Sequence, residues 1–186
     1  MIRSAAMPPV FSLPDVTLVL GGARSGKSAH AERLCEGAAA RLYLATAEAG
    51  DDEMAERIRH HRARRGPAWT TVEEPVELAA ALGRHAAPDR PVLVDCLTLW
   101  LSNVMAAGRD VDAERERLVG ALAATAGPVV LVSNEVGLGL VPETPLGRAF
   151  RDEAGRLNQA VAAVAGRVVF VAAGIPLTLK QEEMAR

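Results

Sequence analysis

Cysteine is scarce in this sequence, which holds only Cys35 and Cys96 among its 186 residues. Two thiols are too few for a disulfide scaffold, and their spacing does not match that of a zinc site. Cys35 falls in a predicted helix, and Cys96 lies just beyond a predicted buried strand. We therefore expect both to be reduced side chains of the core.

A basic surplus and a long apolar run are also missing. The formal net charge is −2 with 24% charged residues, so no basic field attracts nucleic acid. No window reaches the roughly 18 apolar residues that a membrane span requires, and the leader MIRSAAMPPVFSLPDV lacks the apolar run of a signal peptide. We expect a cytoplasmic protein with no nucleic-acid partner and no membrane span.

Apolar residues make up 49% of the chain, enough to fill the core of one domain. Five short apolar runs recur between turn residues: Val16–Leu20, Arg41–Thr46, Pro91–Asp95, Pro128–Ser133 and Arg167–Ala172. Because these runs do not alternate with polar residues, each is typical of a strand covered on both faces, as in parallel sheets. Segments with helical character lie between them: Lys27–Ala38, Asp51–Arg65, Val76–His85, Asp112–Ala126 and Gly147–Ala165.

This alternation predicts a doubly wound, mostly parallel α/β sheet flanked by helices. We expect a single domain over residues 16–186, preceded by a loose N-terminal extension at 1–15. The segments WTTVEEP and GIPLTLK each allow one more short strand. No internal repeat or flexible linker divides the chain.

The segment GGARSGKS follows the first predicted strand and opens a helix, which matches the pattern G-x-x-x-x-G-K-[ST] of a P-loop. Backbone amides in such a loop point at phosphate oxygens, and the helix dipole adds partial positive charge. We expect Lys27 to reach the β- and γ-phosphates and Ser28 to ligate Mg²⁺. A glycine-rich turn without a ligand would require neither side chain.

A carboxylate that completes a magnesium site is expected at the end of another strand. Asp95 closes the apolar run PVLVD, where a parallel strand delivers its last side chain to the carboxyl edge of the sheet. Asp95 is therefore the candidate Walker B residue. The alternative is an ordinary aspartate that caps the following segment.

A predicted helix over Asp51–Arg65 carries two adjacent histidines, with acids in its first turn and arginines in its last. Helical periodicity puts Met54, Ile58 and His61 on one face, which leaves His60 the more exposed histidine. A neutral imidazole is a competent nucleophile toward phosphorus. From spacing alone, however, a solvated charged face without chemistry is favoured.

Four blocks in one order carry a resemblance to a known family: GGARSGKS, YLATAEAGDDEMAERIRHHRARRG, VLVDCLTLWLSN and VSNEVGLGLVPETPLGRAFRDEAGRLNQ. The chain resembles the bifunctional adenosylcobinamide kinase / adenosylcobinamide-phosphate guanylyltransferase of cobalamin biosynthesis, from about Val16 to Lys180. The resemblance implies a RecA-like, single-domain P-loop NTPase fold. It also implies a homotrimer in which neighbouring subunits help to form the corrinoid cleft.

Two reactions are implied by this resemblance. The first phosphorylates the aminopropanol hydroxyl of adenosylcobinamide with ATP or GTP. The second transfers GMP from GTP to that phosphate through a guanylylated histidine, and the matching residue is His60. Mg²⁺ is the implied cofactor, and adenosylcobinamide and its phosphate are the implied acceptors.

Site residues follow from the same match. Nucleotide contacts are implied at Gly21, Gly22, Ala23, Arg24, Ser25, Gly26, Lys27, Ser28, Ala45, Thr46, Ala47, Arg62, Ala63, Arg64, Arg65, Glu73 and Asp95. His60 and Lys27 are the implied catalytic residues, and Ser28 and Asp95 the implied metal ligands. The chain departs from some relatives in having AEAG after YLAT instead of Ser-Gln, and Asp instead of Glu at position 95.

The segment SNEVGLGLVPETP follows the fourth predicted strand, with Asn134 and Glu135 as its polar residues. It is either a long surface turn or a functional loop at the carboxyl edge, and the resemblance favours a corrinoid or phosphate site. Two other functions stay open from the residues alone. One is a kinase without guanylyl transfer, and the other is a nucleotide-dependent switch.

Overall fold

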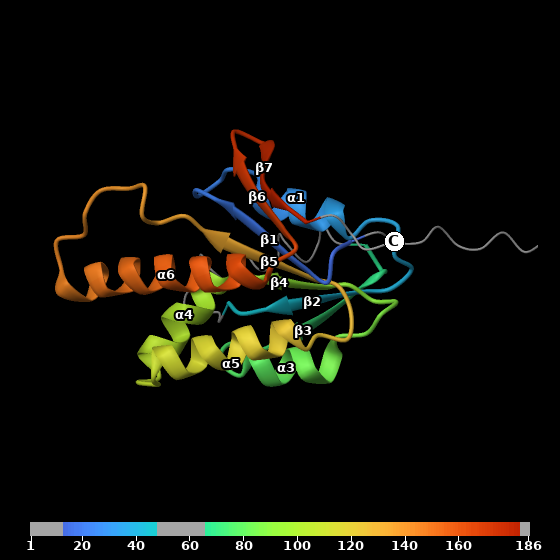
Figure 1. The fold of residues 1–186 in the computed structure, drawn as a ribbon, viewed down its shortest axis with the longest axis horizontal. Coiled ribbons are helices and arrows are strands. Elements are labelled where there is room, and N and C mark those ends of the chain that lie inside the picture. The colour runs from blue at the N-terminus through green and yellow to red at the C-terminus, as the bar shows by residue number, and fades with distance from the viewer. Residues whose placement is uncertain (1–12, 48–65, 183–186) are drawn as a thin grey trace, which may run out of the picture.

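Residues 13–47 and 66–182, which the computed structural model describes, form a seven-stranded sheet with helices on both faces (Figure 1). The strands are β1 (Val16–Gly21), β2 (Arg41–Ala45), β3 (Trp69–Glu73), β4 (Val92–Asp95), β5 (Val129–Asn134), β6 (Arg167–Ala172) and β7 (Ile175–Gln181). Their spatial order is β3-β2-β4-β5-β1-β6-β7. All neighbouring strands run parallel except β6 and β7, which are antiparallel. The predicted doubly wound, mostly parallel sheet is confirmed.

Helices cover the two faces unequally. Helix α1 (Lys27–Leu34) packs on one face, as Figure 1 shows, and the other face carries α3 (Leu78–His85), α4 (Leu97–Ala106), α5 (Val111–Ala123) and α6 (Pro145–Val164). On the first face, Ala31 and Cys35 pack against the sheet. On the second, Trp100 and Leu118 are among the buried residues of the larger cluster. The sheet therefore separates two hydrophobic cores.

The central strands are buried along nearly their whole length because helices cover them from both sides. Every residue of β1 is buried, and in β5 only Asn134 is partly exposed. In β4 only Asp95, the last residue, is partly exposed. This two-sided burial is the reason that these runs show no polar alternation in the sequence.

Among the described helices, α5 and α6 begin at capping side chains. Asp110 Oδ1 accepts a hydrogen bond from Ala113 N at 3.1 Å, at the start of α5. Thr144 Oγ1 accepts one from Gly147 N at 3.1 Å, and Pro145 occupies the first turn of α6. Such caps satisfy amides that have no partner within the helix, and they fix where each helix begins.

The five predicted strands are confirmed, and the segments WTTVEEP and GIPLTLK supply β3 and β7. Helix α1 ends at Leu34 rather than at the predicted Ala38, because the chain leaves helical geometry before Gly37, whose φ is 96°. Helix α4 was not predicted. The helix predicted over 51–65 and most of the predicted extension at 1–15 lie outside the described residues. No helix in the described part of the chain is long and apolar enough to cross a membrane.

Candidate active site

The loop between β1 and α1 has the shape of a phosphate cradle. Gly26, at the N-cap of α1, has a φ of 93°, and Arg24 has a φ of 56°, so the backbone turns tightly just before the helix. Lys27 Nζ donates a hydrogen bond to Gly22 O at 3.1 Å, and its side chain is buried. The ammonium group therefore lies over the loop, beside the helix N-terminus that attracts anions.

Two neighbouring segments hold the loop in this shape. Gly174 N, in the turn between β6 and β7, donates to Ser25 O at 2.8 Å. A Cβ on Gly26 would lie 3.2 Å from Gly174 Cα, so the turn packs directly against the loop. On the other side, Glu135 N donates to Gly21 O at 3.2 Å. The cradle is thus fixed by the strands on both sides of β1.

Asp95 lies at the carboxyl edge of the same sheet. Strand β5 separates β4 from β1, so the aspartate and the loop are two strands apart, which is the RecA-like order. Tyr43 Oη donates a hydrogen bond to Asp95 Oδ2 at 2.8 Å. The other carboxylate oxygen, Oδ1, makes no hydrogen bond with any residue that the structure describes. Asp95 can therefore offer one oxygen to a ligand at this edge of the sheet.

Thr46 ties β2 to the residue after Asp95. Its hydroxyl donates to Cys96 O and accepts from Cys96 N, both at 2.8 Å. Asn103 Nδ2, from α4, donates to Thr46 O at 2.8 Å and to Pro75 O at 3.1 Å. The polar atoms of Thr46 are thus engaged within the protein, and they fix the ends of β2 and β4 relative to each other.

The model of a known family, described as cobinamide kinase / cobinamide phosphate guanyltransferase, matches residues 17–179. The chain belongs to this family. It is 52% identical to the bifunctional adenosylcobalamin biosynthesis protein CobP of Pseudomonas aeruginosa over 90% of this chain and 98% of that protein. It is 42% identical to the protein CobU of Escherichia coli, which has the same description, over 74% of this chain and 84% of that one. The resemblance stated from the sequence is confirmed.

A solved structure from Pyrococcus horikoshii OT3 resembles this fold with a TM-score of 0.51 and 10% sequence identity. The match covers 93% of this chain and 90% of that one. At this identity the likeness concerns the fold alone. The P-loop fold and the family together imply nucleotide substrates, and the family implies a cobinamide substrate.

The donor atoms at the edge fit the requirements of Mg²⁺. Magnesium takes oxygen ligands and keeps several waters, so it needs only one or two protein ligands in addition to nucleotide phosphates. A hydroxyl at Ser28 and a carboxylate at Asp95 are ligands of this type. Within the described residues, no group of three or more His, Cys, Asp or Glu could hold a metal on its own. A Mg²⁺ ion held by Ser28 and Asp95 would take further ligands from the nucleotide phosphates and from water.

The carboxyl edge brings together several of the residues expected from the sequence. Residues 21–28 run from the end of β1 into the first turn of α1, residues 45–47 lie at the end of β2, and Glu73 and Asp95 end β3 and β4. Glu73 is exposed and pairs in register with Ala45. Five further expected residues lie outside the described part of the chain: His60, Arg62, Ala63, Arg64 and Arg65. Their roles, and the nucleotide contacts of the others, stay predictions.

Both cysteines are free and buried, as the sequence predicted. Burial raises the pKa of Cys35 to about 12. Burial, and next the charge of Asp95, raise the pKa of Cys96. Although Cys96 adjoins Asp95, its thiol is therefore protonated at neutral pH and is not a nucleophile.

Sequence reasoning missed three residues that shape the site: Tyr43, Asn103 and Gly174. The contact of Tyr43 with Asp95 depends on β2 lying beside β4, which only the strand order shows. Asn103 lies on the helix that was not predicted. Gly174, the first residue of the segment GIPLTLK that was expected to add a strand, carried a signal, because a glycine between two strands favours a tight turn.

Proposed function

We propose that this protein phosphorylates the aminopropanol hydroxyl of adenosylcobinamide with ATP or GTP and then transfers GMP from GTP to that phosphate. The product would be adenosylcobinamide-GDP. The observation that carries the proposal is the braced P-loop with Lys27 at the carboxyl edge of the sheet, in a chain whose family match runs over residues 17–179.

For the kinase reaction, the amides of residues 21–28 bind the phosphates and Lys27 neutralises charge on the β- and γ-phosphates. Ser28 and Asp95 are the residues that would hold Mg²⁺, which when bound neutralises further negative charge on the nucleotide. The acceptor hydroxyl attacks the γ-phosphorus in line with the leaving oxygen, and the nucleoside diphosphate leaves. The protein contributes mainly position and charge, since this transfer needs little covalent chemistry from it.

For the guanylyl transfer, His60 attacks the α-phosphorus of GTP and pyrophosphate leaves. Arg62, Arg64 and Arg65 would hold the triphosphate tail. A phosphate oxygen of adenosylcobinamide phosphate then attacks the same phosphorus, and the imidazole leaves with its electron pair. In-line attack at the α- and γ-phosphorus needs different geometry, so we propose that GTP binds in two poses or that the segment carrying His60 moves.

We propose that the loop after β5 helps to bind the acceptor, because the backbone amide of Glu135 donates a hydrogen bond to Gly21 O at the start of the P-loop. We also propose a homotrimer. Exposed apolar side chains on this loop, in the first turn of α6 and on β7 support self-association: Leu138, Leu140, Val141, Leu146, Ile175, Leu177 and Leu179. A cytoplasmic location is part of the same proposal, since both nucleotides are abundant there.

Labelled GTP tests the proposal against a kinase without guanylyl transfer. With α-labelled GTP, the protein should form an acid-labile, base-stable adduct that disappears in His60→Ala, whereas His61→Ala serves as the matched control and keeps it. A pure kinase forms no such adduct. A bound GTP pose that serves both attacks at once would contradict the two-pose proposal.

A second assay separates the enzyme from a nucleotide-dependent switch. Adenosylcobinamide added to the protein with γ-labelled ATP should accelerate nucleotide consumption and yield a labelled corrinoid. A switch that catalyses little would consume nucleotide at the same rate with and without the corrinoid. That flat response would refute the kinase half of the proposal.

A further inference from the structure

We propose that Tyr43 is a positioning residue for the nucleotide-bound metal, acting through the carboxylate of Asp95. The inference rests on the proposed function in one respect, since it takes Asp95 as the metal-facing carboxylate. The hydrogen bond from Tyr43 Oη to Asp95 Oδ2, at 2.8 Å, is the observation that carries it. Tyr43 itself is assigned no contact with substrate.

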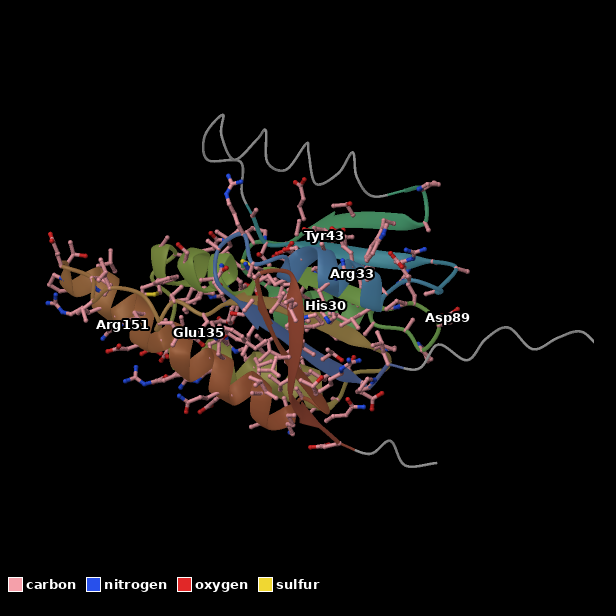
Figure 2. All side chains as sticks on the ribbon, turned by 90° about the horizontal axis from the view of Figure 1, so that it is seen from above. His30, Arg33, Tyr43, Asp89, Glu135 and Arg151 are labelled. Atoms are coloured by element: carbon pink, nitrogen blue, oxygen red, sulfur yellow. The ribbon has the colours of Figure 1, made fainter. Side chains whose placement is uncertain are left out.

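The sheet register brings these two side chains together. Tyr43 pairs with Leu93, and Ala45 pairs with Asp95, across the parallel strands β2 and β4. Because side chains alternate along a strand, Tyr43, Leu93 and Asp95 point to the same face. This is the face that carries α1, and Figure 2 shows Tyr43 beside the helix bearing His30 and Arg33.

The ring of Tyr43 is held on more than one side, so its hydroxyl has a fixed position. Only 5% of the residue is exposed. Its ring meets Trp69 edge to face, with centroids 6.2 Å apart and planes at 80°. Arg41 in turn lies over the Trp69 ring, 5.5 Å from the centroid. A buried aromatic held in this way cannot follow the carboxylate if the carboxylate rotates.

A fixed donor on one oxygen sets the direction of the other oxygen. An O–H donating to a carboxylate is a charge-assisted hydrogen bond, roughly twice as strong as a neutral one. It stops rotation of the Asp95 side chain and leaves Oδ1 as the oxygen that can face a metal or its water. Removing a residue that hydrogen-bonds to a metal ligand typically weakens metal affinity by about 10- to 100-fold.

The test variant is Tyr43→Phe in the full chain, which removes the hydroxyl and keeps the packed ring. Manganese is the probe, because its binding is read by electron paramagnetic resonance without turnover. In the presence of a non-hydrolysable GTP analogue, we expect Mn²⁺ affinity to fall about tenfold. Affinity for the analogue in EDTA should change by less than about twofold, because Tyr43 does not touch the nucleotide.

Ser133→Ala is the matched control. Ser133 Oγ donates to Asn158 Oδ1 at 2.7 Å, on the opposite face of the sheet near the same edge. Its loss should lower the unfolding free energy by about 1 kcal/mol, as the loss of any buried hydrogen bond does, with Mn²⁺ affinity unchanged. A role of Tyr43 in folding alone would give Tyr43→Phe this same pattern, and that result would overturn the proposal.

A double-mutant cycle with Asp95→Asn adds a second criterion. If Tyr43 acts through Asp95, Tyr43→Phe should weaken Mn²⁺ binding little further once the carboxylate is gone. Additive losses would overturn the proposal. Neither measurement uses a corrinoid or His60, so an enzyme that failed to make adenosylcobinamide-GDP could still show the Mn²⁺ shift. The two failures are therefore distinguishable.

Discussion

Replacing Gly26 by alanine should disturb the P-loop in two ways that the structure separates. Gly26 has a φ of 93°, a left-handed conformation that costs an L-residue about 1–2 kcal/mol. In addition, the new Cβ would lie 3.2 Å from Gly174 Cα, which is backbone and cannot rotate away. This crowding should add about 1 kcal/mol, the low end of the usual range for overpacking.

Gly37→Ala is the matched control for the backbone term. Gly37 has a φ of 96°, nearly that of Gly26, and a Cβ there would meet nothing within 4 Å. Gly37→Ala should therefore lower the unfolding free energy by only about 1–2 kcal/mol. Urea unfolding measures the stability of both variants. We expect Gly37→Ala to be more stable than Gly26→Ala by about 1 kcal/mol.

Nucleotide affinity provides the functional half of this prediction. Displacing the turn at Gly174 also disturbs its hydrogen bond to Ser25 O, so loop amides turn away from the phosphates. One lost hydrogen bond to a charged group is worth about 1.5 kcal/mol, or roughly a tenfold weaker Kd for GTP. Calorimetric titration should show this for Gly26→Ala and not for Gly37→Ala. Equal stability and equal GTP affinity in the two variants would refute the reasoning.

Two further predictions concern buried ionisable groups. Burial, with repulsion from Arg33 and Arg167, lowers the pKa of His30 below its ordinary 6.5, so the unfolded chain binds this proton more readily. Stability should therefore fall as pH drops below about 6.5 toward the folded-state pKa, and His30→Gln should flatten that part of the urea-stability profile; parallel profiles for the two proteins would contradict this. Since burial raises the pKa of Cys35 to about 12, iodoacetamide at pH 8 should label it only after unfolding, and labelling of the native protein at the rate of a free thiol would show that the site is open.

The sheet could be predicted from the sequence because its central strands are covered on both faces. Continuous apolar runs such as those of β1 and β5 fit a buried parallel strand better than any other short element. The P-loop could be predicted because its glycines, lysine and serine have fixed chemical roles at fixed spacing. Strand order was not predictable, since pairing depends on packing between distant segments.

Helix α4 shows what the sequence pattern conceals. Its buried residues Leu97, Trp100, Leu101 and Val104 do follow a helical period. However, the segment begins directly after β4 at Cys96, which provides no side-chain cap, so nothing marks where the strand ends and the helix begins. The predicted site lacked Asn103 for the same reason, since this residue lies on α4 and holds the end of β2 in place.

In the candidate site, too, some residues could be predicted from the sequence and others could not. Asp95 could be predicted from its own strand, as the last residue of an apolar run. The hydroxyl that orients it comes from Tyr43, which reads in the sequence as one more buried aromatic in RLYLA. Only the register between β2 and β4 reveals that the two groups meet.

The most direct test of the account is the affinity of Lys27→Ala for GTP, measured by titration calorimetry with Mg²⁺ present. Lys27 lies over the P-loop with its ammonium group on Gly22 O, ready to exchange that carbonyl for phosphate oxygens. We expect the Kd for GTP to rise at least tenfold and both transfer reactions to be lost, while urea unfolding shows a folded protein. Unchanged GTP affinity and turnover in this variant would contradict it.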